Sequence, residues 1–140
     1  MTHPGSEAIS RGARAGGSIV YRGIHLLVDC RGVDRQLCLD DKRFLQCMAD
    51  AAVRAGANVI SQVRYRFGED SPPGFAAICL LDESHVSAHS YADTGLVALD
   101  IFTCGKTDPH RILEILTNEL DLGEVSVREV GRFELATKVR

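Results

Sequence analysis

The sequence contains no tryptophan, no C-x-x-C pair and no apolar run approaching the roughly 20 residues that span a bilayer. The missing C-x-x-C pair and the odd count of five cysteines argue against a structural zinc site and a disulfide framework. Lys and Arg number 16 against 19 Asp and Glu, which leaves no excess of positive charge for a nucleic-acid backbone. We therefore expect a cytoplasmic protein with no nucleic-acid partner and no membrane contact.

The cysteines that are present differ in their sequence surroundings. Free cysteine behaves as a small buried hydrophobe in most proteins, and we expect this of four of the five. Cys104 is the exception, because it ends a predicted strand next to Gly105, a turn residue. The four cysteines expected in the core are Cys30, Cys38, Cys47 and Cys79.

The length of 140 residues allows one domain with a substantial core. Residues 1–17 are rich in Gly, Ser and Ala and have no apolar core of a secretory signal, so we expect a disordered leader there. Residues 18–140 are expected to form a single domain.

Hydrophobic periodicity predicts six strands and two helices. Asp40 or Asp41 caps the first helix and Gly56 ends it, while Pro109 stands in the first turn of the second helix. The strands are expected over residues 18–30, 58–67, 75–81, 85–91, 95–104 and 124–130, and the helices over residues 39–57 and 107–120.

The order of these elements is β-α-β-β-β-β-α-β. Short links between the middle strands favour antiparallel pairing, so the prediction is an α+β fold: a two-layer α/β sandwich of a mainly antiparallel sheet with two helices on one face. The other face of such a sheet stays uncovered unless a second copy packs on it. We therefore expect a homodimer.

One short segment carries most of the polar chemistry. Two histidines in it stand four residues apart, but on a strand that spacing separates them by about 13 Å, so the sequence predicts no metal site. Its two adjacent carboxylates point to opposite faces of a strand, unlike a glycosidase pair. An alternative is that the serines are turn and edge residues and His89 a core histidine with its hydrogen bonds satisfied. The segment comprises Asp82, Glu83, Ser84, His85, Ser87 and His89.

Four motifs along the chain carry a resemblance to a known family. They are "GIHLLVDC", "RYRF", "ESHVSAH" and "DIFTCG", in that order. Together they resemble the prokaryotic S-adenosylmethionine decarboxylase proenzyme family, which is pyruvoyl-dependent, over roughly Tyr21 to Val130. The resemblance implies a self-cleaving lyase of polyamine biosynthesis that makes its own cofactor.

The resemblance also implies roles for particular residues. Ser84 would attack the carbonyl of Glu83, and elimination would leave a pyruvoyl group at the head of the downstream chain. His89 matches the family's processing base, and a near-neutral imidazole suits that proton transfer. The substrate amine would condense with the pyruvoyl carbonyl, and the imine would withdraw electrons as carbon dioxide leaves. Cys104 matches the residue that returns a proton to the substrate carbon; the alternative is a buried structural thiol.

Substrate recognition departs from the family pattern. Phe67 and Tyr91 fall at the positions that stack adenine, although either could be a core aromatic. The family's aromatic-Pro-Glu triplet, whose glutamate binds the ribose hydroxyls, is Tyr91-Ala92-Asp93 in this chain. Ala76 stands where the family commonly has a hydroxyl that helps self-cleavage.

Three functions remain open at this stage. The first is decarboxylation of S-adenosylmethionine, and the second is the same chemistry on L-arginine or L-ornithine, which the altered triplet would suit. The third is an uncleaved regulatory or binding homologue, which Ala76 favours and which Ser84, His89 and Cys104 argue against. For either enzyme, we expect a homodimer of cleaved protomers.

Overall fold

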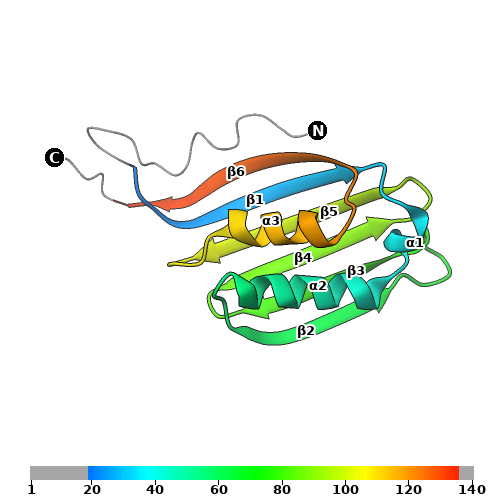
Figure 1. Cartoon of the computed structure of the whole chain (residues 1–140), viewed down its shortest axis with the longest axis horizontal. Helices are drawn as coiled ribbons and strands as arrows, with labels where there is room; N and C mark the ends of the chain where they lie inside the picture. The colour runs from blue at the N-terminus through cyan, green and yellow to red at the C-terminus, as the bar shows by residue number, and fades with distance from the viewer. Residues whose placement is uncertain (1–18, 136–140) are drawn as a thin grey trace.

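The computed structural model describes residues 19–135, which form one antiparallel sheet with helices on one side (Figure 1). The sheet has six strands in the order β2-β3-β4-β5-β1-β6, so the first strand of the chain lies between the last two. The strands are β1 (Tyr21–Arg31), β2 (Val59–Arg66), β3 (Gly74–Leu81), β4 (Ser84–Tyr91), β5 (Leu96–Cys104) and β6 (Glu124–Glu134).

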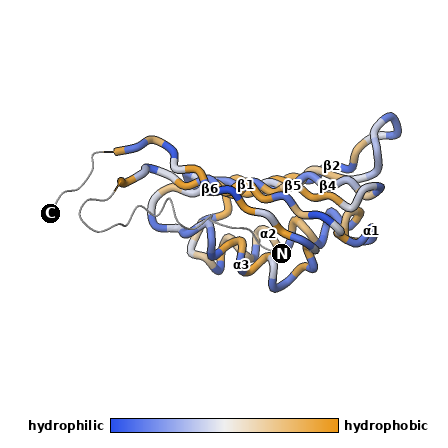
Figure 2. Tube along the Cα trace, turned by 90° about the horizontal axis from the view of Figure 1, so that it is seen from above, coloured by the Kyte–Doolittle hydropathy of each residue, from blue (hydrophilic) through white to orange (hydrophobic). Residues whose placement is uncertain are grey.

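Two long helices, α2 (Asp41–Arg54) and α3 (Pro109–Glu119), cover the same face of the sheet, as the view along the sheet in Figure 2 shows. Asp40 caps α2 by accepting a hydrogen bond from the N–H of Arg43, and Asp108 caps α3 in the same way. A third helix, α1 (Arg35–Cys38), is a single turn that the sequence did not predict.

The core lies between this face and the helices. Alternate residues of each central strand point into it, as the period of two in a strand requires. Phe44 of α2 packs on Phe75 of β3 with ring centroids 5.3 Å apart, and both side chains are fully buried. Burial raises the pKa of the Cys79 thiol to about 11 and that of Cys30 to about 12, so both stay protonated core residues as expected.

The strand residues that alternate with the core residues point to the opposite face of the sheet. No described helix covers this face, and we call it the open face. Because directly paired residues of antiparallel strands share a face, the strand register arranges the open face in rows. One row runs Arg132, Gly23, Cys104 across β6, β1 and β5. Several large apolar side chains are exposed on this face: Val63, Tyr65, Ile78, Leu80 and Val130.

The edge strand β2 is tied to α2 by charge. Asp41, in the first turn of α2, is buried and accepts hydrogen bonds from Arg64 Nη1 at 2.7 Å and Arg66 Nε at 3.0 Å. Burial acts to raise the pKa of Asp41, but the two guanidinium groups outweigh it and hold the pKa below its usual range.

The predicted fold class is confirmed, and two details differ from the prediction besides the additional helix α1. Strand β6 continues to Glu134, four residues beyond its predicted end, because it pairs with β1 as far as Tyr21. Cys47 is partly exposed rather than buried. The leader predicted over residues 1–17 lies outside the described residues. Within residues 19–135, no helix has the length and apolar character needed to cross a membrane.

Candidate active site

The bond between Glu83 and Ser84 lies at the tip of the β3–β4 hairpin. Leu81 pairs with Ser84, so Asp82 and Glu83 form a two-residue turn. Glu83 has φ of 63°, in the left-handed region that disfavours side chains other than glycine. Such a conformation costs on the order of 1 kcal/mol or more and persists only where the surrounding structure imposes it. The chain therefore holds a strained residue directly before Ser84.

The Glu83 side chain is also held in place. Its Oε1 accepts a hydrogen bond of 2.7 Å from Arg22 Nη2 on β1. Both side chains are more than half exposed, so the pair contributes little to stability. It does connect the hairpin tip to the neighbouring end of β1.

Ser84 begins β4 and is buried. Its Oγ accepts a hydrogen bond of 3.3 Å from the backbone N–H of Cys104, at the end of β5. The structure therefore brings the predicted nucleophile and the predicted proton donor together at one end of the sheet.

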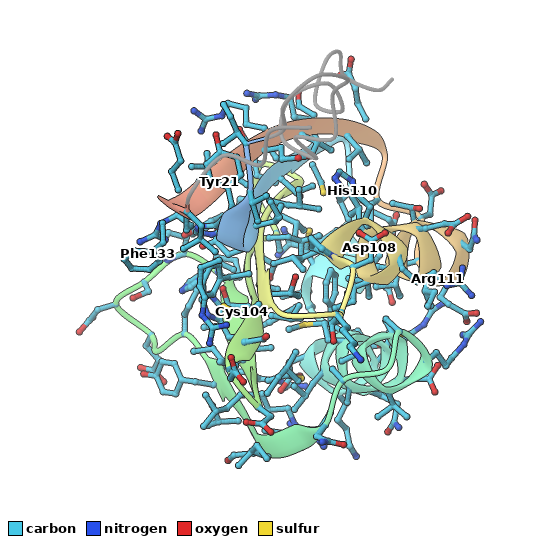
Figure 3. The ribbon with its side chains drawn as sticks, turned by 90° about the vertical axis from the view of Figure 1, so that its left-hand side faces the viewer. Tyr21, Cys104, Asp108, His110, Arg111 and Phe133 are labelled. Carbon is cyan, nitrogen blue, oxygen red and sulfur yellow. The ribbon has the colours of Figure 1, made fainter. Side chains whose placement is uncertain are left out.

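The Cys104 thiol packs above a glycine. A Cβ added to Gly23 would lie 3.0 Å from Cys104 Sγ and 2.8 Å from Cε1 of Phe102, so only glycine fits under these two side chains. Figure 3 looks onto this end of the molecule, where Tyr21, Cys104 and Phe133 lie. The single glycine of "GIHLLVDC" thus leaves the space that the Cys104 thiol occupies.

Two imidazoles and a phenyl ring fill the next row of the open face. The rings of His25, His85 and Phe102 lie 5.7 to 6.1 Å apart, and His25 Nε2 is 3.5 Å from Asp100 Oδ1 without the geometry of a hydrogen bond. Burial lowers the pKa of His85, the neighbouring His25 lowers it further, and Asp100 partly opposes both. His85 is therefore neutral near pH 7, directly after Ser84 in the chain.

His89 does not join this group. It lies on the open face of β4, paired with Ala76 of β3 and Ala98 of β5, and it is exposed rather than buried in the core. Five residues of strand separate it from Ser84 by about 16 Å. Among residues 19–135, no three His, Cys, Asp or Glu side chains converge as a metal site.

The predicted substrate-binding residues lie at the far end of the same strands. The rings of Phe67 and Tyr91 are 5.9 Å apart, and Tyr65 extends the group with its ring 6.4 Å from that of Phe67. Asp93 follows in the β4–β5 turn, where Arg35 Nη1 donates to its Oδ1 at 2.7 Å. Seven residues of β4 place Tyr91 about 23 Å from Ser84.

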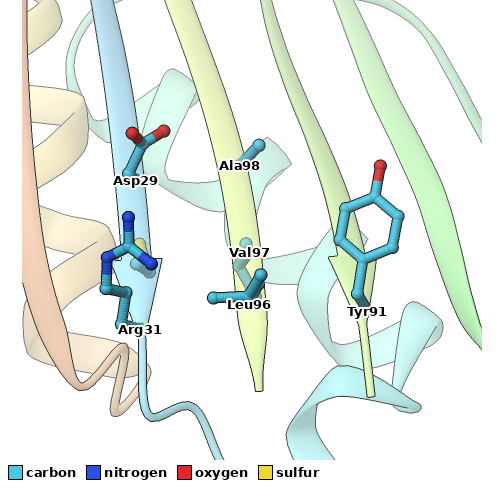
Figure 4. Close-up of a pocket in the computed structure, with 7 residues that line it drawn as sticks. Asp29, Arg31, Tyr91, Leu96, Val97 and Ala98 are labelled. Carbon is cyan, nitrogen blue, oxygen red and sulfur yellow. The ribbon is translucent and has the colours of Figure 1, made fainter. Parts of the chain in front are cut away.

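A pocket of about 240 Å³ opens beside Tyr91 (Figure 4). Asp29 and Arg31 line it from β1, while Leu96 and Ala98 form part of its lining from β5. The sequence interpretation missed Asp29 and Arg31, although their spacing of two residues on a strand places them on one face.

Comparisons with known proteins show which family the chain belongs to. A family model described as S-adenosylmethionine decarboxylase matches residues 24–133, which is most of the chain. The chain belongs to the S-adenosylmethionine decarboxylase family. It is accordingly a self-processing decarboxylase of polyamine biosynthesis, as the motifs implied.

Individual relatives support this membership of the S-adenosylmethionine decarboxylase family. Proteins named S-adenosylmethionine decarboxylase proenzyme from Caldicellulosiruptor saccharolyticus and Thermoplasma volcanium are 30% and 37% identical to this chain. The alignments cover 84% and 81% of this chain, and 94% and 85% of the relatives. The crystal structure of the adenosylmethionine decarboxylase from Aquifex aeolicus matches with a TM-score of 0.71 at 26% identity, over 83% of this chain and 94% of that one.

Proposed function

We propose that the chain cuts itself between Glu83 and Ser84 and then decarboxylates S-adenosylmethionine with a pyruvoyl group derived from Ser84. One observation carries this proposal: Ser84 comes directly after Glu83, which has a left-handed backbone, and its hydroxyl accepts a hydrogen bond from the backbone N–H of Cys104. The five free cysteines suit a reducing compartment, and we place the reaction in the cytoplasm.

Each residue at this end of the sheet has a place in that chemistry. Attack by Ser84 Oγ on the Glu83 carbonyl would relieve the left-handed backbone, and Arg22 would hold the departing Glu83. A pyruvoyl group derived from Ser84 at the head of β4 would supply the electron-withdrawing carbonyl that decarboxylation requires. The Cys104 thiol, fixed above Gly23, would return a proton to the substrate carbon.

We further propose that a second copy completes the site. His89 is about 16 Å from Ser84 within one chain, and Tyr91 about 23 Å, too far for either to act on the same substrate atoms. Two open faces packed about a two-fold axis that runs across the strands would reverse the strand direction. The His89 and Tyr91 end of one copy would then lie over the Ser84 end of the other, and the exposed apolar side chains of the open face would be buried.

Self-cleavage is tested by intact-mass analysis of the purified chain. The expected result is two fragments, residues 1–83 and 84–140, with the second carrying a blocked, pyruvoyl N-terminus. Ser84→Ala should leave the chain whole. A wild-type chain that stays uncut would contradict the proposal and favour an uncleaved regulatory homologue.

The shared site is tested by mixing two inactive chains. Ser84→Ala and His89→Ala should each fail to cut, or cut slowly, when expressed alone. In a mixed dimer, the intact His89 of the Ser84→Ala chain should restore cutting of the His89→Ala chain, seen as fragments of that chain by mass. No restoration in mixed dimers would argue that each chain works alone.

A second substrate class has one observation in its favour. Asp93 replaces the family's ribose-binding glutamate, and its Oδ1 already accepts a hydrogen bond from Arg35, with which a ribose hydroxyl would have to compete. L-arginine and L-ornithine have no ribose to bind. Release of labelled carbon dioxide from S-adenosylmethionine, L-arginine and L-ornithine, measured in parallel on the cleaved protein, decides between them; higher kcat/KM on either amino acid would overturn the first choice.

A further inference from the structure

Two residues other than glycine adopt left-handed backbone conformations between residues 19 and 135. They are Glu83, with φ of 63°, and Phe133, with φ of 60°. Glu83 stands at the cleavage point, and Phe133 is near the end of β6, next to the row of Gly23 and Cys104. Strained backbone gathers at functional sites, so the second residue calls for a functional explanation as well.

Phe133 and Phe102 hold the guanidinium of Arg132 between them. The Cζ atom of Arg132 lies 5.6 Å from the centroid of the Phe102 ring and 5.8 Å from that of Phe133. These are cation–π distances. The Phe102 ring itself lies above Gly23 beside Cys104 Sγ. The Arg132 side chain therefore reaches inward from the edge strand over the ring that flanks the thiol.

The charge of Arg132 has no counterion within the described part of the chain. Three arginines there, Arg31, Arg128 and Arg132, have neither a carboxylate nor a carbonyl partner, and all three belong to the open face. Of these, Arg132 alone shares a row with Cys104. A cation held by two rings and lacking an anion is a ready receptor for a carboxylate.

We propose that Arg132 binds the α-carboxylate of the substrate and so orients it over the head of β4. The inference rests on the proposed decarboxylation, but not on which substrate is used. S-adenosylmethionine, L-arginine and L-ornithine all carry an amine and a carboxylate on one carbon. When the amine reaches the head of β4, the carboxylate lies on the patch formed by Cys104, Phe102 and Arg132.

This role has a particular kinetic signature. The carboxylate loses its charge as carbon dioxide departs, so a bond to it is stronger in the bound substrate than in the transition state. Loss of that bond raises KM without lowering kcat. A residue that only supported the fold or the thiol would instead lower kcat or weaken every ligand alike.

The test compares Arg132→Gln, Arg132→Lys and, as a matched control from the same strand and face, Arg128→Gln. The cleaved proteins are assayed with S-adenosylmethionine, and calorimetry measures binding of decarboxylated S-adenosylmethionine, which lacks the carboxylate. Arg132→Gln should raise KM about tenfold to a hundredfold, the loss of a charge-assisted hydrogen bond, with kcat unchanged or higher. Its dissociation constant for the decarboxylated ligand should stay within about twofold, Arg132→Lys should recover part of KM, and Arg128→Gln should resemble wild type.

The opposing outcomes are equally definite. An unchanged KM, or equal weakening of substrate and decarboxylated ligand, would overturn the assignment. If Arg132→Gln does not fold or cut itself, Arg132→Lys is compared with wild type instead. The quantity compared is the KM for the substrate divided by the dissociation constant for the decarboxylated ligand. A ratio equal to that of wild type would also overturn the assignment. A wild-type protein that cuts itself but leaves S-adenosylmethionine intact is assayed on L-arginine and L-ornithine with agmatine and putrescine as the decarboxylated ligands. A wild-type protein that decarboxylates none of the three substrates would refute the proposed function. If wild type is active and Arg132→Gln has the same KM as wild type, only this inference is refuted.

Discussion

At the scale of single residues, backbone conformation and available space restrict which amino acids fit at the end of the sheet that holds Ser84. Glu83 takes a conformation that suits glycine, and Gly23 leaves space for Cys104 and Phe102. The left-handed backbone of Glu83 costs free energy in the folded chain, and this cost is consistent with the proposed cleavage after Glu83.

Replacing Glu83 with glycine should release that strain and slow self-cleavage. About 1 kcal/mol of ground-state strain corresponds to about a fivefold lower rate, measured as the appearance of the 84–140 fragment. In the uncut Ser84→Ala background, the same change should raise the Tm. Asp82→Gly, in the same turn without positive φ, and Arg22→Gln, which removes only the ion pair, are the controls. Faster cutting by Glu83→Gly than by both controls would count against stored strain.

His85 should make the protein sensitive to mild acid. Because its pKa is lowered in the folded state, folding favours the neutral imidazole. The contribution of neutral His85 to the free energy of unfolding is fully present above the pKa that the residue has in the unfolded chain, near 6.5. It is lost as the pH falls from that value through the lower pKa of the folded state. The Tm of wild type should therefore fall more between pH 7.5 and 5.5 than that of His85→Gln. Equal slopes would show that other groups carry the acid sensitivity.

At the scale of elements, two ion pairs join β2 to α2: Arg64 and Arg66 each donate a hydrogen bond to one carboxylate oxygen of Asp41. A strand at the edge of a sheet is otherwise secured by one neighbour only, here β3. The arginines cover the helix-facing side of β2, where an apolar side chain would be ordinary.

Asp41→Ala should lower the free energy of unfolding by about 2 kcal/mol, since it removes hydrogen bonds to charged groups from a buried position. Thermal or urea unfolding of the Ser84→Ala chain measures this without interference from cleavage. Asp50→Ala removes an exposed i,i+4 pair with Arg54 on the same helix and should change stability by less than about 0.5 kcal/mol. Similar losses in the two variants would contradict a special role for Asp41.

The pairing of β3 with β4 places Ala76 beside the predicted processing base. Ala76 lies directly opposite His89, so a hydroxyl at position 76 would stand beside the imidazole. Ala76→Ser should then speed self-cleavage by about tenfold through assisted proton transfer, followed by mass over time. Ala98→Ser, which flanks His89 from β5, tests whether any neighbouring hydroxyl is enough. No acceleration by Ala76→Ser would indicate that position 76 has no part in cutting this chain.

At the scale of the whole molecule, the sequence predicted the elements that are encoded by local hydrophobic periodicity and capping residues. Helices α2 and α3 have strong periodicity and Asp caps, and both were expected close to their observed ends. Helix α1 is too short to show a period, and the end of β6 becomes a strand through pairing with β1, which no local signal reports.

The site shows the same division. Motifs pointed to Ser84 and Cys104, and the structure places them together. Arg132 and Gly23 join them only through the register of β6, β1 and β5, a non-local property. The distance from Ser84 to His89 could have been estimated from strand spacing alone, and it is the distance on which the proposal of a site shared between two chains rests.

The strand order has a consequence for the cut protein. The 1–83 fragment would contain β1, β2 and β3, and the 84–140 fragment β4, β5 and β6, so β1 of one fragment lies between β5 and β6 of the other. The two pieces are interlaced, and neither has a complete sheet of its own. Cleavage would thus change the unfolding of each protomer from a unimolecular reaction into a dissociation, whose midpoint rises with protein concentration even where the folded shape is unaltered.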